Sequence, residues 1–281
     1  MHYFLVDSVM GIDQLAQTNP HPRDSRIHFD EGPHIYTIDG KADYTSVTTW
    51  NHSHFEQFDA DAIIAKMMAS PKWNQNKYFG KTPDEIKEMW EVNRDRAAKA
   101  GTEMHYDIEC FYNNCLPEGF DWNACPERRY FMKFHKLYDY LKPYRTEWTV
   151  FHEELKLAGS IDMTFLNEKG DVVIYDWKRS RGIEKSNRFG KYSTTSCIDH
   201  LPDTNFWHYS LQLNVYAFIL ESKYGVNVDS LFLVCLHPEN VNSNFQRIQV
   251  PWLREEIKQL CAFRKMQLEG LKQKHIIGIK K

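Results

Sequence analysis

The chain has 281 residues, of which 42% are hydrophobic and 14% aromatic. This composition excludes an intrinsically disordered protein and supports a substantial core, so we expect one α/β domain with elaborations. The net charge of −3 excludes a protein that is basic overall, so any nucleic-acid binding must use a local patch. The 6 cysteines form no C-x-x-C pair, and the apolar runs are too short to span a bilayer. We therefore expect a soluble intracellular protein in a reducing compartment, the cytoplasm or the nucleus, that is neither secreted nor bound to a membrane.

The N-terminal part of the chain predicts a small hairpin and a short helix. Residues 1–26 show little pattern, and the hairpin is expected over Ile27–Tyr36, with the segment His34–Ile38 leading into an Asp-Gly turn at residues 39 and 40. Phe58–Met68 is typical of a helix. Between them, the hydroxyl groups of Ser46 and Thr48 could cap a helix or contact a phosphate, and the residues alone leave both possibilities open.

Two helices are expected over the next part of the chain, with a break at residues 100–102. The first starts at Thr82-Pro83, where the proline and the acids that follow favour a helix N-terminus, and runs to about residue 98. The second carries His105 and Glu109, which are four residues apart and therefore lie on one face. Such a pair is often simply solvated, but the imidazole is also a candidate metal ligand.

A further amphipathic helix is predicted over Pro126–Leu141, with an apolar stripe that indicates core packing. The alternating segment Arg145–Phe151 predicts a strand that carries Glu147. Glu153 and Glu154 are alternatives to Glu147 as site residues, although their place at a strand end is more typical of a turn.

The stretch Leu157–Lys178 predicts two strands joined by a turn at residues 167–170. Its charged residues are Asp162 on the first strand and Asp176 and Lys178 on the second. Side chains alternate along a strand, so Asp176 and Lys178 point to the same side. If the pairing places Asp162 opposite them, two carboxylates meet, and a divalent cation relieves their repulsion. A neighbouring lysine can hold a water molecule or offset charge on a phosphate.

The segment that follows this hairpin is basic and has no clear secondary structure. Between Lys178 and Lys191 there are six cationic residues and one acid, Glu184. A long irregular stretch in a compact domain is commonly functional or disordered. Because it leaves the strand of Asp176 and Lys178, we expect it to contact phosphates over the site, the alternative being a merely solvated loop.

The rest of the chain predicts a buried helix, a strand and a closing helix. The helix spans Asn205–Tyr224 and places Gln212 and Tyr216 one turn apart on one face. The strand spans Val228–Leu236 and is expected beside the hairpin. The closing helix spans Trp252–Leu271.

The order of these motifs resembles the RecB-like exonuclease group of the PD-(D/E)XK nuclease superfamily. G-T-x-x-H at residues 101–105, a glutamate on the next strand, G-S-I-D at 159–162, D-W-K at 176–178 and Q-x-x-x-Y at 212–216 follow one another in the chain. The likeness extends to nucleases of phages and large DNA viruses, to the mitochondrial genome maintenance exonuclease group and to lambda-type exonucleases.

This resemblance implies an α/β fold with a restriction-endonuclease-like core, in which a central mixed sheet is flanked by helices. The whole chain, 1–281, would be one nuclease domain. It would have an N-terminal helical and hairpin elaboration over 1–100, a nuclease core over 101–271 and a basic tail over 272–281.

The resemblance also implies the roles of individual residues. The ligands of one or two Mg²⁺ or Mn²⁺ ions would be His105, Asp162, Asp176 and the backbone carbonyl of Trp177. Catalysis would use Asp162, Asp176, Lys178 and Glu147, with Lys178 positioning the attacking water. The contacts to DNA would come from Gln212, Tyr216, Arg179, Arg181, Lys185 and Arg188, and from Ser46 and Thr48. Some superfamily members carry an iron–sulfur cluster, but only Cys235 and Cys261 follow the Q-x-x-x-Y motif, so none is expected here.

The function implied is a divalent-metal-dependent deoxyribonuclease. We expect an exonuclease that acts on single-stranded DNA or duplex ends in replication, recombination or repair. Two alternatives remain from the sequence: an RNA-cleaving or structure-specific endonuclease of the same fold, and a non-catalytic nucleic-acid-binding module. Protein partners, polarity and oligomeric state are not predicted.

Overall fold

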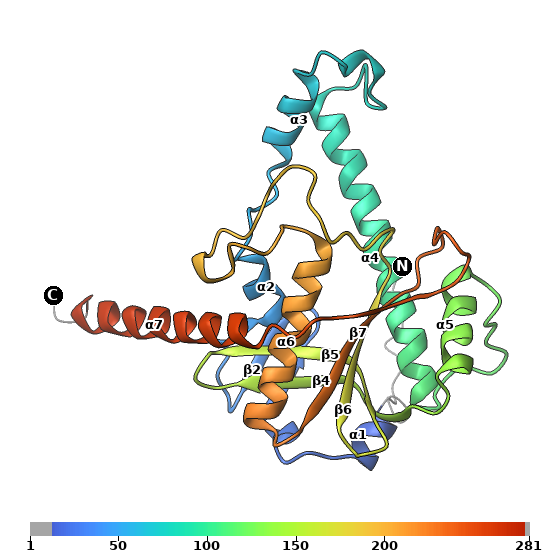
Figure 1. Ribbon diagram of the computed structural model, residues 1–281, viewed down its shortest axis with the longest axis vertical. Helices are drawn as coiled ribbons and strands as arrows, with labels where there is room; N and C mark the ends of the chain where they lie inside the picture. The colour runs from blue at the N-terminus through green and yellow to red at the C-terminus, as the bar shows by residue number, and fades with distance from the viewer. Residues whose placement is uncertain (1–12, 279–281) are drawn as a thin grey trace.

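A central six-stranded mixed sheet organises the chain in this computed structural model, which describes residues 13–278 and the side chains up to residue 270 (Figure 1). The strand order is β3-β5-β6-β7-β8, and β4 pairs with the free edge of β5. The pairs β3–β5 and β6–β7 are parallel and the others antiparallel. The protein is therefore of the α/β class, with a central mixed sheet flanked by helices.

In the described part of the chain, a short helix and three short strands come first, followed by four helices. The strands β4, β5 and β6 follow, then a long helix, the strands β7 and β8, and a last helix. The helices are α1 (Gln14–Thr18), α2 (Val47–His52), α3 (Ala60–Met68), α4 (Pro83–Tyr112), α5 (Pro126–Leu137), α6 (Asn205–Lys223) and α7 (Arg254–Gly278). The strands are β1 (Ile27–Asp30), β2 (Ile35–Ile38), β3 (Thr45–Ser46), β4 (Lys142–His152), β5 (Leu157–Leu166), β6 (Val172–Lys178), β7 (Val228–Cys235) and β8 (Gln246–Gln249). Short 3-10 turns lie at Asp24–Arg26, Trp73–Gln75 and Ser196–Ile198.

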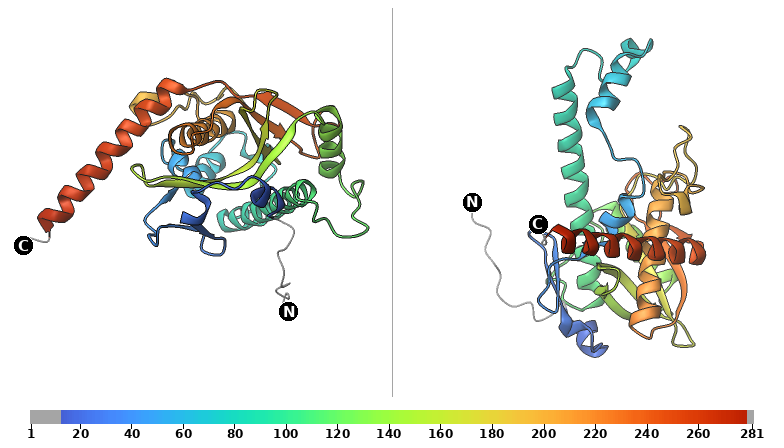
Figure 2. Two further views of the ribbon diagram at one scale, coloured as in Figure 1. Left: turned by 90° about the horizontal axis from the view of Figure 1, so that it is seen from below. Right: turned by 90° about the vertical axis from the view of Figure 1, so that its left-hand side faces the viewer.

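The two faces of the sheet have separate cores because neighbouring strand residues point to opposite sides. On one face, Ile174 and Leu233 pack with α2, α6 and the start of α7. On the other, Tyr175 and Trp177 pack with α5 and the second half of α4. Seen from below, α6 and α4 lie on opposite sides of the sheet (Figure 2).

The hairpin predicted over Leu157–Lys178 is confirmed as β5 and β6. Met163 pairs with Tyr175 and Leu166 with Val172 in an antiparallel ladder. Gly170 closes the turn with φ of 85°, a conformation that glycine adopts without steric cost. The parallel neighbour β7 confirms the strand expected beside the hairpin.

The break expected at residues 100–102 is wrong, because α4 is one helix of 30 residues. A single glycine in a helix costs only about 1 kcal/mol relative to alanine. That cost is outweighed by a capping box between Thr82 and Glu85 and by the burial of Met104 and Ile108. The helix therefore continues through the boundary that the sequence suggested at residue 100.

The first half of α4 and α3 stand away from the sheet as an arm (Figure 1). The arm has a small core of its own, which consists of Ile64, Tyr78 and Ile86. The helix predicted over Phe58–Met68 is confirmed as α3, and Asp59 caps it by accepting a hydrogen bond from the Ala62 amide.

Other expected boundaries shift, and some elements were not foreseen. α5 ends at Leu137, four residues early, since residues 138–141 turn the chain into β4 and leave the Leu137 side chain exposed. α7 continues to Gly278, past the expected end at Leu271, and residues 279–281 of the expected basic tail lie outside the described residues. Residues 1–12 of the N-terminal lead-in also lie outside them. The helices and strands that were not foreseen are α1, α2, β3 and β8.

The N-terminal hairpin is confirmed as β1 and β2, and both Asp39 and Gly40 take positive φ in the turn that follows. No helix in the described part of the chain is both long enough and apolar enough to cross a membrane. The six cysteines are all free thiols.

Candidate metal centre

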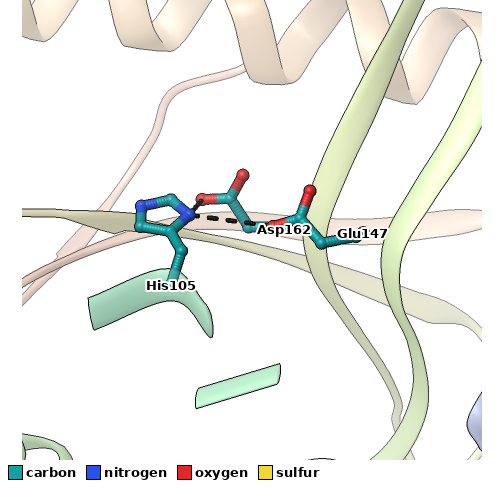
Figure 3. A group of neighbouring side chains, drawn as sticks. All are labelled: His105, Glu147 and Asp162. Carbon is teal, nitrogen blue, oxygen red and sulfur yellow. Dashed lines mark ion pairs between the residues drawn. The ribbon is translucent and has the colours of Figure 1, made fainter. Parts of the chain in front are cut away.

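Three side chains from separate elements meet at one end of the sheet: His105 from α4, Glu147 from β4 and Asp162 from β5 (Figure 3). One ligand atom from each lies within 4.8 Å of the others. His105 Nδ1 is 3.6 Å from Asp162 Oδ2 and 3.7 Å from Glu147 Oε1. One imidazole nitrogen and two carboxylate oxygens are a donor set suited to a divalent cation, and the imidazole favours Mn²⁺ or Zn²⁺ over Mg²⁺.

Each of these side chains is held by a second contact, which for His105 and Glu147 falls on the outer atom and for Asp162 on the same Oδ2 that faces His105. His105 Nε2 lies 2.9 Å from the Trp177 carbonyl, which can only accept, so Nε2 carries the hydrogen and Nδ1 faces the carboxylates. Ser160 Oγ donates to Glu147 Oε2 at 2.7 Å, and the Trp177 amide donates to Asp162 Oδ2 at 2.8 Å. Supporting contacts of this kind orient the ligands in protein metal sites.

The backbone of Glu147 has φ of 38°, in the left-handed region that non-glycine residues seldom adopt. Its neighbours Thr146 and Trp148 pair with Met163 and Ile161 on β5, so Glu147 lies opposite Asp162. A residue held in this region costs about 1–3 kcal/mol, and such strain clusters at functional sites. The strained strand position is thus the one that brings the Glu147 carboxylate to Asp162.

The electrostatics of the centre favour an additional positive charge. Burial alone would lower the pKa of His105, but the Asp162 and Glu147 carboxylates outweigh burial and raise it to about 9. Burial raises the pKa of Asp162. Burial, with a contribution from Glu147, raises the pKa of Glu109 to about 8. The cluster therefore favours an added proton or cation.

Asp176 and Lys178 form a buried ion pair beside the cluster, with Oδ2 and Nζ 2.7 Å apart. The two side chains lie on one side of β6, as the strand alternation predicts. Burial raises the pKa of Asp176 to about 7, although Lys178 acts in the opposite direction. Burial would lower the pKa of Lys178, but Asp176 and Asp162 outweigh it and raise that pKa. The ammonium also lies 4.6 Å from the centroid of the Tyr209 ring.

Only some of the predicted metal ligands lie together in the structure. His105 and Asp162 belong to the three-residue cluster, and Glu147, expected in a supporting or second-metal role, joins them. Asp176 lies next to the cluster but is paired with Lys178, and the Trp177 carbonyl accepts a hydrogen bond from His105. Glu153 and Glu154 lie in the turn after β4 and pair with Arg23 and Lys223, respectively, so they are not alternatives to Glu147.

The residues predicted to hold the strand on α2 and α6 lie in one neighbourhood. Ser46 caps α2 by accepting a hydrogen bond from the Thr49 amide, which favours the capping interpretation. Gln212 Nε2 lies 3.4 Å from both Thr48 Oγ1 and the Tyr216 hydroxyl oxygen. Tyr216 itself is only 3% exposed, so its ring is part of the core.

Gly159, in the G-S-I-D motif, is required by this packing. A Cβ atom at this position would lie 2.6 Å from the Tyr216 hydroxyl oxygen, closer than any side chain permits. The motif thus positions α6 against β5 as well as carrying Ser160 and Asp162.

The cations of the basic loop, which we define as residues 179–191, differ in their surroundings. Arg179 pairs with Glu127 at 2.8 Å in a largely buried contact, and Arg181 pairs with Glu239 at 2.7 Å while remaining 82% exposed. Lys185 and Arg188 are exposed and have no ion-pair partner among the described residues. The Lys185 ammonium lies 4.7 Å from the Phe206 ring centroid.

Several residues of this region were not foreseen from the sequence. Ser160 lies inside the quoted motif, and its spacing of two from Asp162 was an available signal for a supporting role. Asn51, His52, His208 and Tyr209 line a cleft beside Lys178. They come from two helices that are far apart in the chain, so no local pattern indicated them.

Comparison of the sequence with models of protein families and with curated proteins found no match to either.

Proposed function

We propose that this protein is a divalent-metal-dependent deoxyribonuclease with a restriction-endonuclease-like core. The proposal is carried by one observation: His105, Glu147 and Asp162, which lie on three different elements, converge next to the Asp176–Lys178 pair. A site for phosphodiester hydrolysis needs a bound cation together with a group that holds water or the phosphate, and these two parts are adjacent here.

The chemistry of the cluster fits a divalent cation. The lone pair of neutral His105 Nδ1 points at two carboxylates, an arrangement that is repulsive unless a proton or a metal ion lies between them. The second contacts of all three side chains are already satisfied, so binding requires little reorganisation. Mn²⁺ or Mg²⁺ held there would polarise a phosphoryl oxygen and lower the pKa of a water molecule.

The residues of the chain then have separate tasks. Glu147 and Asp162 supply the negative charge that holds the cation, and Asp176 fixes the Lys178 ammonium at 2.7 Å. That ammonium positions the attacking water or offsets the charge that develops on the phosphate. The burial of the pair strengthens this effect, since charges interact more strongly away from water.

The substrate is DNA, held by the exposed cations of the basic loop and by the polar groups of α2 and α6. The loop emerges directly from β6 after Lys178, and the Lys185 ammonium lies 4.7 Å from the ring centroid of Phe206 at the start of α6. Phosphate contacts of this kind supply affinity without sequence preference.

The test is digestion of end-labelled oligonucleotides by the purified protein with Mn²⁺, with Mg²⁺ and with EDTA. We expect metal-dependent cleavage of single-stranded DNA and none with EDTA, and labels at the two ends report polarity. An RNA strand of the same sequence serves as the comparison. Preferential cleavage of the RNA strand would mean that RNA, and not DNA, is the substrate. Absence of cleavage of every strand with both metals would contradict the proposal.

A further inference from the structure

A cleft of about 270 Å³ is lined in part by Lys178, whose ion pair with Asp176 lies beside the candidate metal centre. Its walls come from α2, from the start of α6 and from the end of β6. Tyr209 joins the two sites, since its ring lines the cleft and lies 4.6 Å from the Lys178 ammonium. A group bound in the cleft would therefore adjoin the atoms that react.

The walls of the cleft combine aromatic rings with amides. The rings are those of His52, His208 and Tyr209, and the amides include Asn51 and Gln212. The His208 ring is fixed by Asp203, 2.9 Å away, and by the Phe55 ring, whose centroid lies 4.0 Å from its own. Among the residues that the structure describes, no carboxylate lines the cleft, and Lys178 is its one permanently charged residue.

Asn51 is the polar group in this wall that lacks a partner. The residue is 3% exposed, and neither atom of its side-chain amide has a hydrogen-bond partner among the described residues. An unpaired buried amide is costly, so it marks a place where a ligand can supply the missing bonds. Both atoms are shielded from solvent, so a ligand would reach them only if a neighbouring side chain turned aside.

The amide also discriminates between the parts of a nucleotide. It presents one donor group and one acceptor, whichever way it is turned. A phosphodiester offers hydrogen-bond acceptors only and is best bound by several cationic side chains. The edge of a base offers both donors and acceptors, which an amide can match. Aromatic rings stack on bases, and this contact is independent of sequence.

We propose that the cleft binds an unpaired nucleobase of the nucleotide that adjoins the scissile phosphate. The inference rests on the proposed nuclease function and specifies its substrate: a base bound here has left any duplex, so the strand is cut where it is single-stranded or frayed. Stacking against His52 and Tyr209, with Asn51 at the base edge, would set which phosphodiester reaches Lys178.

The experiment is a scan with abasic sites in single-stranded DNA oligonucleotides. Each oligonucleotide carries one abasic residue at a different position and is digested with Mn²⁺ under single-turnover conditions. We expect cleavage to slow at one bond, at a fixed offset from the abasic residue, by about 5- to 150-fold, the range that corresponds to the removal of one stacked base. All other bonds should be cut at their usual rates.

Two variants test whether the cleft is responsible. His52 is exposed, so the His52→Ala variant should fold normally. Without the His52 ring a base in the cleft stabilises the bound strand less, so an abasic residue should slow cleavage less than it does in the unaltered protein. His52→Phe keeps a ring and should retain the effect. His28→Ala, which alters an exposed histidine on β1, is the matched control and should behave as the unaltered protein.

The outcomes separate this inference from the function on which it rests. Uniform cleavage at every bond, whatever the position of the abasic residue, would overturn the base cleft and leave the nuclease intact. An offset effect that is the same in His52→Ala as in the control would place the base elsewhere. Failure to cut the unmodified strand would instead overturn the nuclease function, and the inference with it.

Discussion

The candidate metal centre and the basic loop arrange their charges in opposite ways. In the centre, the Glu147 and Asp162 carboxylates face one another across two strands with only His105 between them. In the basic loop, Arg179 and Arg181 each have a carboxylate partner, and Lys191 pairs with Glu56. Like charges are thus held together in one region, while opposite charges are matched in the other.

This difference shows that a run of cations and a cluster of acids are not equally good indicators of a binding site. A run of cations in the sequence overstates the charge available to a ligand, because part of it is consumed by pairing within the fold. Acids that the fold brings together around a single imidazole indicate a ligand more directly, since a cation relieves their repulsion. Within the described residues, Lys185 and Arg188 are the cations of the loop that have no ion-pair partner. Arg181 is in an exposed pair with Glu239, which contributes little to stability.

The largest effect is expected when the metal centre loses a ligand. Asp162→Asn should abolish Mn²⁺ binding measured by calorimetry and reduce cleavage by at least about 10³-fold, because the metal supplies several kcal/mol of stabilisation. Asparagine can still accept from the Trp177 amide, and the buried charge is gone, so the melting temperature without metal should not fall. Asp229→Asn, at an exposed position on β7, is the control. Unchanged Mn²⁺ affinity in Asp162→Asn would contradict the ligand assignment.

A second comparison concerns two lysines: Lys178, beside the metal centre, and Lys185, in the basic loop. At saturating DNA, Lys178→Ala should lower the single-turnover rate by about 10²-fold, since it removes an oriented charge at the reacting phosphate. Lys185→Ala should leave that rate unchanged and should weaken DNA binding only. A defect in Lys178→Ala that appeared wholly in affinity would make Lys178 a binding residue.

The attachment of residues 193–195, just after the basic loop, to the turn that follows α2 should weaken at acid pH. The carbonyl of His54 accepts hydrogen bonds from Ser193 and Thr194, and its Nδ1 lies 2.9 Å from Thr195 Oγ1. Burial, with a smaller effect of Arg264, lowers the pKa of His54 to about 4. Between pH 6.5 and pH 4 the unfolded state therefore binds the proton that the folded state does not, and stability falls as the pH falls.

The size of this decrease is at most roughly 3 kcal/mol, and it is complete below pH 4. Urea unfolding measured across this range should show it, and His54→Gln should show a shallower dependence on pH. His152, whose pKa burial also lowers to about 4, is present in both proteins and cancels from the comparison. Identical pH profiles for the two proteins would contradict the role of His54.

Sequence reasoning was most successful where the pattern is local. The hairpin of β5 and β6, the buried helix α6 and the strand with Glu147 all follow from alternation or helical spacing over a few residues. The continuity of α4 did not, because the burial of Met104 against the sheet decides whether the helix passes Gly101. That contact joins residues far apart in the chain.

The same limit applies to the candidate site. Alternation along β6 places Asp176 and Lys178 together, as expected. The choice of Glu147 over Asp176 beside His105 depends instead on the strained backbone at residue 147. No spacing rule reveals a positive φ at a glutamate within a strand. The partners of Arg179 and Arg181 lie at residues 127 and 239, so pairing within the basic loop was equally hidden.

The last expected effect concerns the free cations of the loop and is the smallest. Replacing Lys185 and Arg188 together by alanine should flatten the salt dependence of binding to single-stranded DNA. The slope of log affinity against log salt should fall by about 0.7 for each phosphate that the protein no longer neutralises. Stability should be unchanged, because both side chains are exposed and neither has an ion-pair partner among the described residues. The measurement is a titration of the protein with single-stranded DNA in Ca²⁺ across a salt series, and the affinity for Mn²⁺ should be unaffected.

Arg179→Ala is the informative contrast: it leaves Glu127 unpaired in a largely buried environment, so it should lower the melting temperature as well as the affinity for DNA. An unchanged slope in the double variant would mean that the strand follows a path away from the loop, with the Ser46–Thr49 end of α2 as the nearest alternative.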